Sequence, residues 1–230
     1  MGTTGEAARV PSRRSYIYWY CLLLPLAWIA AWRAHDNLDS GRQWTIASDT
    51  AYWIAMKFLV WLIPVFAVIL GVEHQTLGGF LELRNCRFAA TWGVPLGLVL
   101  LAADYRFVAG PAGRHLGIPE FGAAFLNGVL VSPIAEEITF RGFCLERLRL
   151  NGMPFWTSNV LTSVVFISLH IVGWFFQSKI GALARIVRPL SSLLFLSLLF
   201  GWMKRKTGSL YAPILLHLLN NLYAGALRGG

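Results

Sequence analysis

The sequence lacks the short motifs that mark the common soluble hydrolases and metal-binding domains. No His-Glu-x-x-His motif occurs, so a zinc site of the metalloprotease type has no independent support. No Gly-x-Ser-x-Gly turn surrounds Ser132 or Ser168, which argues against a serine nucleophile. The cysteines, Cys21, Cys86 and Cys144, are odd in number and have neither disulfide nor metal-ligand spacing. We therefore expect no disulfide framework.

Charged residues are also scarce, and they fall between long apolar stretches. They make up 13% of the 230 residues, whereas 56% are hydrophobic and the mean hydropathy is +0.56. Ordinary globular chains are about 45–50% apolar and lack repeated apolar runs of membrane length. The composition therefore predicts an integral membrane protein, surrounded by the lipid bilayer.

The net charge of +9 comes from short basic clusters between the apolar runs rather than from one basic surface. The preference of Lys and Arg for the cytoplasmic side of a membrane explains this distribution, so we expect no nucleic-acid partner. Counting Lys and Arg on alternate sides of the runs gives eleven on the N-terminal side and eight on the other. This bias predicts a cytoplasmic N-terminus.

Seven apolar runs predict membrane helices. They cover about residues 16–32, 52–72, 89–103, 121–150, 156–176, 189–203 and 210–227. There is no internal repeat and no soluble domain among them. The pattern predicts an all-α fold, a polytopic transmembrane helix bundle of about seven spans.

Two residues interrupt the apolar runs without carrying an assigned function. Lys57 lies within two turns of the start of the second run, where its long side chain can extend to the membrane interface. Pro133 lies in the fourth run and removes one helical hydrogen bond, which predicts a kink there.

Two adjacent carboxylates, Glu136 and Glu137, also lie in the fourth run. A charged side chain at the bilayer centre costs about 2.5–3.5 kcal/mol on insertion scales, so an acid at this depth indicates a functional site. In a helix Glu137 and Arg141 share a face, four residues apart, and can pair. Glu136 points about 100° away and can face a cavity. The alternative is that these charges mark the point where a span leaves the bilayer.

Three further polar side chains occur in later apolar runs. His170 lies in the fifth run, and His217 and Asn221 lie on one helix face of the seventh. Each can be a packing residue, because intramembrane His and Asn commonly bond across helices. A carboxylate and two imidazoles on three helices together indicate a working site, since burying them without purpose is unfavourable.

Two chemistries fit these groups, and both predict hydrolysis of an amide. In the first, a glutamate takes a proton from water with help from one histidine, while the other histidine and Asn221 donate hydrogen bonds to the developing oxyanion. In the second, His170, His217 and one or both glutamates bind a zinc ion that activates the water.

The polar residues form three motifs that resemble those of the CPBP family, which is also called Abi. This family comprises CAAX prenyl endopeptidases and bacteriocin-processing or immunity proteins. The motifs are Glu-Glu-x-x-x-Arg over residues 136–141, Phe-x-x-x-His from Phe166 to His170, and His-x-x-x-Asn from His217 to Asn221. The resemblance covers about residues 120–226, with all three motifs in order within apolar runs.

The resemblance implies an intramembrane endopeptidase of the glutamate type with a CAAX-protease-like core. By carry-over, Glu136 is the general base and His170 is its partner on the attacking water. His217 and Asn221 are implied to form the oxyanion hole.

The remaining motif residues, Glu137 and Arg141, are implied to support the site. No cofactor is required in this scheme. Zinc is compatible with the residues, and its ligands would be Glu136, His170 and His217.

The apolar runs and the resemblance together give the expected organisation of the chain and its substrate. A basic tail over 1–15 and membrane spans over 16–118 precede a catalytic membrane core over 119–228. The expected substrate is a membrane-associated or lipid-modified protein, cleaved near its C-terminus. The expected location is the bacterial inner membrane.

Two other classes of protein remain open from the residues. One is a non-catalytic scaffold or bacteriocin-immunity-type protein of the same fold, in which the polar residues hold helices together. The other is a proton-coupled transporter that uses the carboxylate and the histidines as a relay. The absence of an inverted repeat argues against the transporter.

Overall fold

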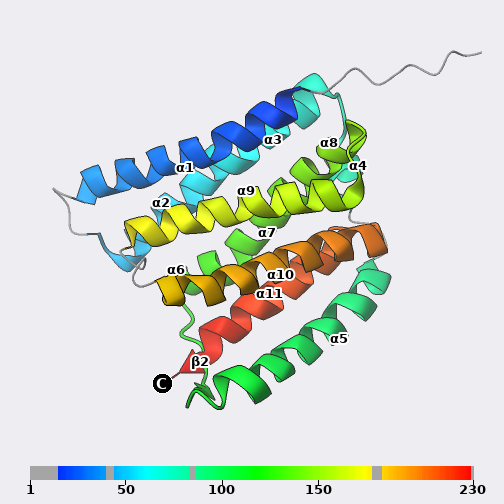
Figure 1. Cartoon of the computed structure of the whole chain (residues 1–230). Coiled ribbons are helices and arrows are strands. Elements are labelled where there is room, and N and C mark those ends of the chain that lie inside the picture. Colours follow the sequence, from blue (N-terminus) through cyan, green and yellow to red (C-terminus); the bar gives the residue numbers. More distant parts are fainter. Residues whose placement is uncertain (1–14, 40–43, 83–85, 178–182, 229–230) are drawn as a thin grey trace, which may run out of the picture.

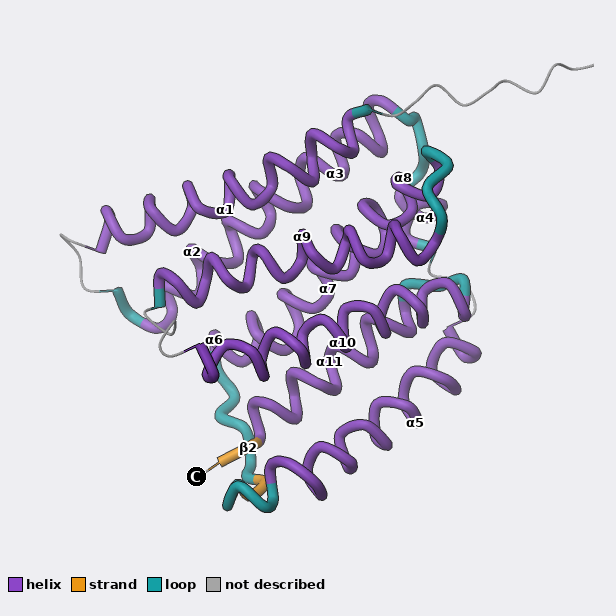
Figure 2. Tube along the Cα trace, in the orientation of Figure 1, coloured by secondary structure: helices purple, strands orange, loops and turns teal. Residues whose placement is uncertain are grey.

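The structure, a computed structural model, describes residues 15–39, 44–82, 86–177 and 183–228. Most of these residues are helical (Figure 2). The all-α prediction is therefore confirmed. Most of the expected basic tail, including Arg9, Arg13 and Arg14, lies outside the described residues, as does Lys179.

Each of the seven predicted runs forms a helical segment. Their elements are α1 (Tyr16–Asp39); α2 (Ile46–Met56), η1 (Lys57–Leu62), α3 (Ile63–Phe66) and η2 (Ala67–Val72); α4 (Leu77–Leu81), α5 (Cys86–Asp104) and η3 (Tyr105–Ala109); α6 (Ala123–Phe125), η4 (Leu126–Val131), α7 (Ser132–Glu137), η5 (Ile138–Cys144) and α8 (Leu145–Leu150); α9 (Phe155–Phe176); α10 (Leu183–Thr207); and α11 (Tyr211–Ala226). The elements written η are π-helical turns.

Five of the described segments are long and apolar enough to cross a membrane. They are Tyr16–Asp39, Ile46–Val72, Leu77–Ala109, Ala123–Leu150 and Phe155–Phe176. With 16 residues, α11 is shorter than the about 20 residues of a typical membrane helix. Large apolar side chains such as Leu22, Leu26 and Val99 are exposed on the outside, as lipid contact requires. The chain is an integral, multi-pass membrane protein.

The helices are arranged as neighbouring rods (Figure 1). Along the series α1, α9, α10, α11 and α5, each helix contacts the next. The segment 123–150 packs behind this row, where it contacts η1 on one side and α9 and α11 on others. This central segment carries both glutamates near its middle, so the acids lie among several helices rather than at an end of the segment.

The central segment alternates between π-helical and α-helical turns. Pro133 lies near the start of α7, directly after the π-helical stretch η4, and Glu137 ends α7 before η5 begins. Such π turns are a common cause of irregular helix geometry, often at functional sites. Helix type therefore changes on both sides of Pro133, and the kink expected there stays a prediction.

Two buried apolar clusters hold the helices together. The larger joins the N-terminal spans to η5 and α9 through Trp28, Trp61, Phe140 and Phe166, among others. The smaller joins α5, α10 and α11. His217 on α11 stacks on Phe200 of the smaller cluster, with ring centroids 4.8 Å apart. The polar residues therefore lie where the two clusters meet.

A short antiparallel pair of strands joins two distant parts of the chain. In β1 (His115–Leu116) and β2 (Leu227–Arg228), His115 lies opposite Arg228 and Leu116 opposite Leu227. The amide of Gly117 donates to the Ala226 carbonyl, 2.8 Å away, and so extends the pairing. The loop before the central segment is thereby tied to the end of α11.

Candidate active site

Glu137 is fully enclosed and lies between two cationic or potentially cationic groups. Its side chain has 0% exposure, and its Oε1 accepts from Arg141 Nη1 at 3.1 Å and from His217 Nδ1 at 2.8 Å. The expected ion pair four residues along the helix is therefore present. A buried carboxylate requires such partners, because an unpaired charge at this depth is costly.

Arg141 is held by the helix opposite it as well as by Glu137. Its Nη2 donates to the Ser197 Oγ at 2.7 Å and to the Ser197 carbonyl at 3.0 Å, and Ser197 Oγ donates to Ser163 Oγ at 2.9 Å. The guanidinium lies 4.9 Å from the ring centroid of Phe166 and 5.2 Å from that of Phe200. These contacts place Phe166 as a packing residue against the cation.

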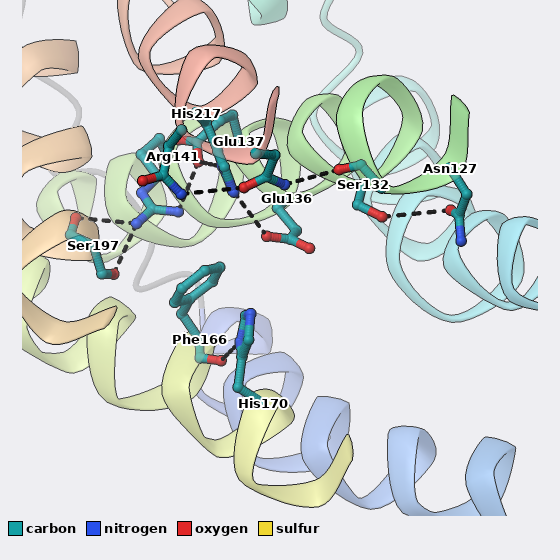
Figure 3. A network of polar contacts seen from close by, with 12 residues as sticks. Asn127, Ser132, Glu136, Glu137, Arg141, Phe166, His170, Ser197 and His217 are labelled. Carbon is teal, nitrogen blue, oxygen red and sulfur yellow. Dashed lines mark hydrogen bonds and ion pairs between the residues drawn. The ribbon is translucent and has the colours of Figure 1, made fainter. Parts of the chain in front are cut away.

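Glu136 has a different environment from its neighbour. Its Oε2 lies 3.6 Å from His217 Nε2, which is too long for a direct hydrogen bond. Glu136 lines a cavity of about 200 Å³, and His170 of α9 lines the same cavity. Figure 3 shows the two side chains on separate elements, with His170 beyond Phe166. The structure thus brings the predicted base and its predicted partner to one cavity.

The hydrogen bond of His170 fixes which ring nitrogen is available. Its Nδ1 lies 3.0 Å from the Phe166 carbonyl, which can only accept. Nδ1 therefore carries the proton, and in the neutral ring Nε2 is left as an acceptor. An acceptor at this position can take a hydrogen bond from a water molecule in the cavity.

His217 joins the two carboxylates. A carboxylate accepts, so Nδ1 of His217 donates to Glu137 and its Nε2 faces Glu136 as an acceptor when the ring is neutral. In the neutral ring, the one N–H group of His217, a residue that the resemblance assigns to an oxyanion hole, is thus bound to Glu137.

Asn221 lies on the same helix but contacts a different element. Its Nδ2 donates to the Gly128 carbonyl of η4 at 2.8 Å, and Asn221 lines a second, separate cavity of about 620 Å³. The structure therefore does not bring Asn221 to the cavity of Glu136 and His170. Its implied role in an oxyanion hole stays a prediction.

The residues proposed as zinc ligands do not form a metal cluster. Among the described residues, no group of three or more His, Cys, Asp or Glu side chains is arranged to hold a metal ion. Glu136 and Nε2 of His217 approach each other, while Nδ1 of His217 donates to Glu137. Zinc binding by Glu136, His170 and His217 stays a prediction.

Lys57 is a residue of this site that sequence reasoning missed. It was expected to extend to the membrane interface, but its exposure is only 7%, and it lines the cavity of Glu136 and His170. The expectation was wrong because η1 packs against the central segment, so the side chain turns inward. Its position within an apolar run is the one signal that the sequence offered.

Comparison with known proteins agrees with the motifs. Residues 119–223 match the family described as Rce1-like, type II CAAX prenyl endopeptidase. Searches of curated proteins and of solved structures found no match. The matched part includes all three polar motifs. It excludes the N-terminal spans, and with them Lys57. Residues 119–223, a little under half of the chain, are therefore a region of the Rce1-like CAAX prenyl endopeptidase type, that is, of the CPBP or Abi family.

Proposed function

We propose that this protein is an intramembrane endopeptidase of the glutamate type, which hydrolyses a peptide bond of a membrane-associated or lipid-modified protein. The observation that carries the proposal is the shared cavity of Glu136 and His170, beside a Glu137 whose Oε1 is bound by Arg141 and His217. One carboxylate is available for chemistry and the other is held by the scaffold.

In this scheme a water molecule occupies the cavity between the two side chains. Glu136 takes one proton from the water, while Nε2 of His170 accepts a hydrogen bond from the remaining O–H group of the water. The water oxygen bonds to the carbonyl carbon, and the carbonyl oxygen takes up the negative charge. The C–N bond then breaks as the protonated Glu136 returns the proton to the leaving amine. The scheme requires no cofactor and no metal.

The proposed substrate class follows from the family and from the depth of the site. The family description names CAAX prenyl endopeptidases, whose substrates carry a lipid near the C-terminus. A cavity between membrane helices is reached most directly by a protein that is itself embedded or lipid-anchored. We propose cleavage near the C-terminus of such a protein, in a bacterial inner membrane, by an enzyme with a cytoplasmic N-terminus.

The test compares cells that express the wild type, Glu136→Gln or Glu120→Gln, with mass spectrometry of new termini of membrane proteins. Glu136→Gln keeps the side-chain shape and removes the base, so we expect the wild-type termini to disappear. Glu120 is exposed and supplies the same substitution as a control. Identical termini from the wild type and Glu136→Gln, at equal protein levels, would favour the non-catalytic scaffold.

A further inference from the structure

Lys57 is a buried cation whose direct partner carries no charge. Among the residues that the structure describes, its Nζ makes one hydrogen bond, to Oδ1 of Asn127 at 2.9 Å, and no ion pair is formed. Burying a lysine in a membrane span is costly, so such a residue marks a functional site by default. An ammonium group has three N–H donors, and the bond to Asn127 uses one.

The bond to Asn127 places Lys57 on the side of the central segment that carries Glu136. Oδ1 of Asn127 also accepts from Ser132 Oγ at 3.4 Å (Figure 3). Ser132 precedes Glu136 by four residues and therefore lies on the same helix face. Lys57, Ser132 and Glu136 all line the cavity that contains His170. The lysine is thus anchored beside the water-activating groups.

The proposed hydrolysis needs a hydrogen-bond donor for the oxyanion, and neither His217 nor Asn221, the donors implied by the family resemblance, lines the cavity of Glu136 and His170. Nδ1 of His217 donates to Glu137, and Nδ2 of Asn221 donates to Gly128. Loss of one oxyanion donor typically lowers kcat about 10²–10³-fold, so an efficient site requires one.

Unpaired donors occur in the same cavity wall. The indole Nε1 atoms of Trp32 and Trp61 are buried and have no hydrogen-bond partner among the described residues, and both side chains line the cavity. Buried donors are normally paired, by protein or by a ligand. Both indoles belong to the N-terminal spans, which also supply Lys57 to this cavity.

We propose that Lys57 is a catalytic residue that stabilises the oxyanion of the tetrahedral intermediate. When the oxygen of the water activated by Glu136 bonds to the carbonyl carbon, the C=O electron pair moves onto the carbonyl oxygen, and Nζ of Lys57 donates a hydrogen bond to it. The carbonyl re-forms as the C–N bond breaks, and the lysine keeps its protons throughout. This inference rests on the proposed endopeptidase activity, and it gives a catalytic role to a span outside the matched family region.

The test measures kcat and KM of the purified protein in detergent, on a peptide taken from a cleavage site found in the wild-type cells. The variants are Lys57→Met, Lys57→Arg and Glu136→Gln, with the exposed Lys206→Met as the matched control. We expect Lys57→Met to lower kcat about 10²–10³-fold with little change in KM. Lys57→Arg should recover part of kcat because it keeps a cationic donor.

Other outcomes would overturn the proposal in distinguishable ways. Full kcat in Lys57→Met, or a raised KM at unchanged kcat, would exclude oxyanion stabilisation; the second result would indicate binding of a substrate anion instead. Equal activity of the wild type and Glu136→Gln would overturn the endopeptidase proposal and this one together. Where thermal unfolding shows that Lys57→Met is not folded, Lys57→Gln keeps a donor for Asn127 and removes the charge, so kcat should fall below that of the wild type; full kcat in Lys57→Gln would overturn the proposal.

Discussion

Glu136 and Glu137 are neighbours in the chain, but the regions around them differ in almost every respect. The region of Glu137 is packed: Arg141 and His217 donate to Glu137, Arg141 also donates to Ser197, and aromatic rings pack against the guanidinium. The region of Glu136 is hollow, with a cavity of about 200 Å³. One helical step between adjacent residues is therefore enough to separate a structural carboxylate from one available for chemistry.

The two regions also differ in where their residues come from. The packed region is built within the matched core, from the central segment, α9, α10 and α11. The cavity is completed by α1 and η1, which contribute Trp28, Trp32, Lys57 and Trp61. Substitutions in the packed region should thus reduce stability, and those in the cavity should reduce turnover.

The largest expected effect on stability comes from breaking the packed region at Arg141. Arg141→Ala leaves the buried carboxylate of Glu137 without its guanidinium, and loss of one partner of a buried ion pair costs about 3–5 kcal/mol. We expect a lower thermal unfolding midpoint in detergent and a reduced yield of folded protein.

The control for this variant is Arg149→Ala, in the same helical segment. Arg149 pairs with Glu146 at 3.2 Å in a partly exposed position, where such a pair contributes about 0–1 kcal/mol. Equal unfolding midpoints for the two variants would show that the buried ion pair of Glu137 and Arg141 contributes no more to stability than the exposed pair.

A smaller effect on stability is expected where α9 and α10 approach closely. A Cβ at Gly201 would lie 1.9 Å from Oδ1 of Asn159, whose buried amide donates to the Leu198 carbonyl at 2.9 Å. Gly201→Ala should therefore destabilise by about 1–3 kcal/mol, the usual cost of overpacking, as measured by thermal unfolding. Gly71→Ala, where a Cβ meets no atom within 4 Å, is the control. A Gly201 variant as stable as that control would show that the interface can open.

The smallest effect is expected at Asn221, which lies in neither region. The Asn221 amide donates to the Gly128 carbonyl. Asn221→Ala should therefore lower stability by about 0.5–1.5 kcal/mol, the contribution of one hydrogen bond, and leave kcat nearly unchanged. Thermal unfolding and a rate assay on the same sample check this. A fall in kcat of about 10²–10³-fold would instead support the oxyanion role implied by the family and would count against Lys57.

Much of the fold and part of the site could be predicted from the sequence, because both depend on local periodicity. Apolar runs locate the helices, and four-residue spacing predicts the contact between Glu137 and Arg141. The position of Lys57 could not be predicted, since it depends on how η1 packs against the central segment. Likewise, nothing local indicates that Ser197, 56 residues further along the chain, binds Arg141.

The pairing of β1 with β2 has a consequence for how such proteins can be rebuilt. It joins the chain just before the matched region to the chain just after it, so the two ends of that region lie side by side. Units whose ends meet tolerate permutation and insertion well. The preceding spans could therefore be exchanged only for others that refill the apolar cluster shared with η5 and α9. If Lys57 acts as proposed, such an exchange would also change the donor that stands opposite Glu136.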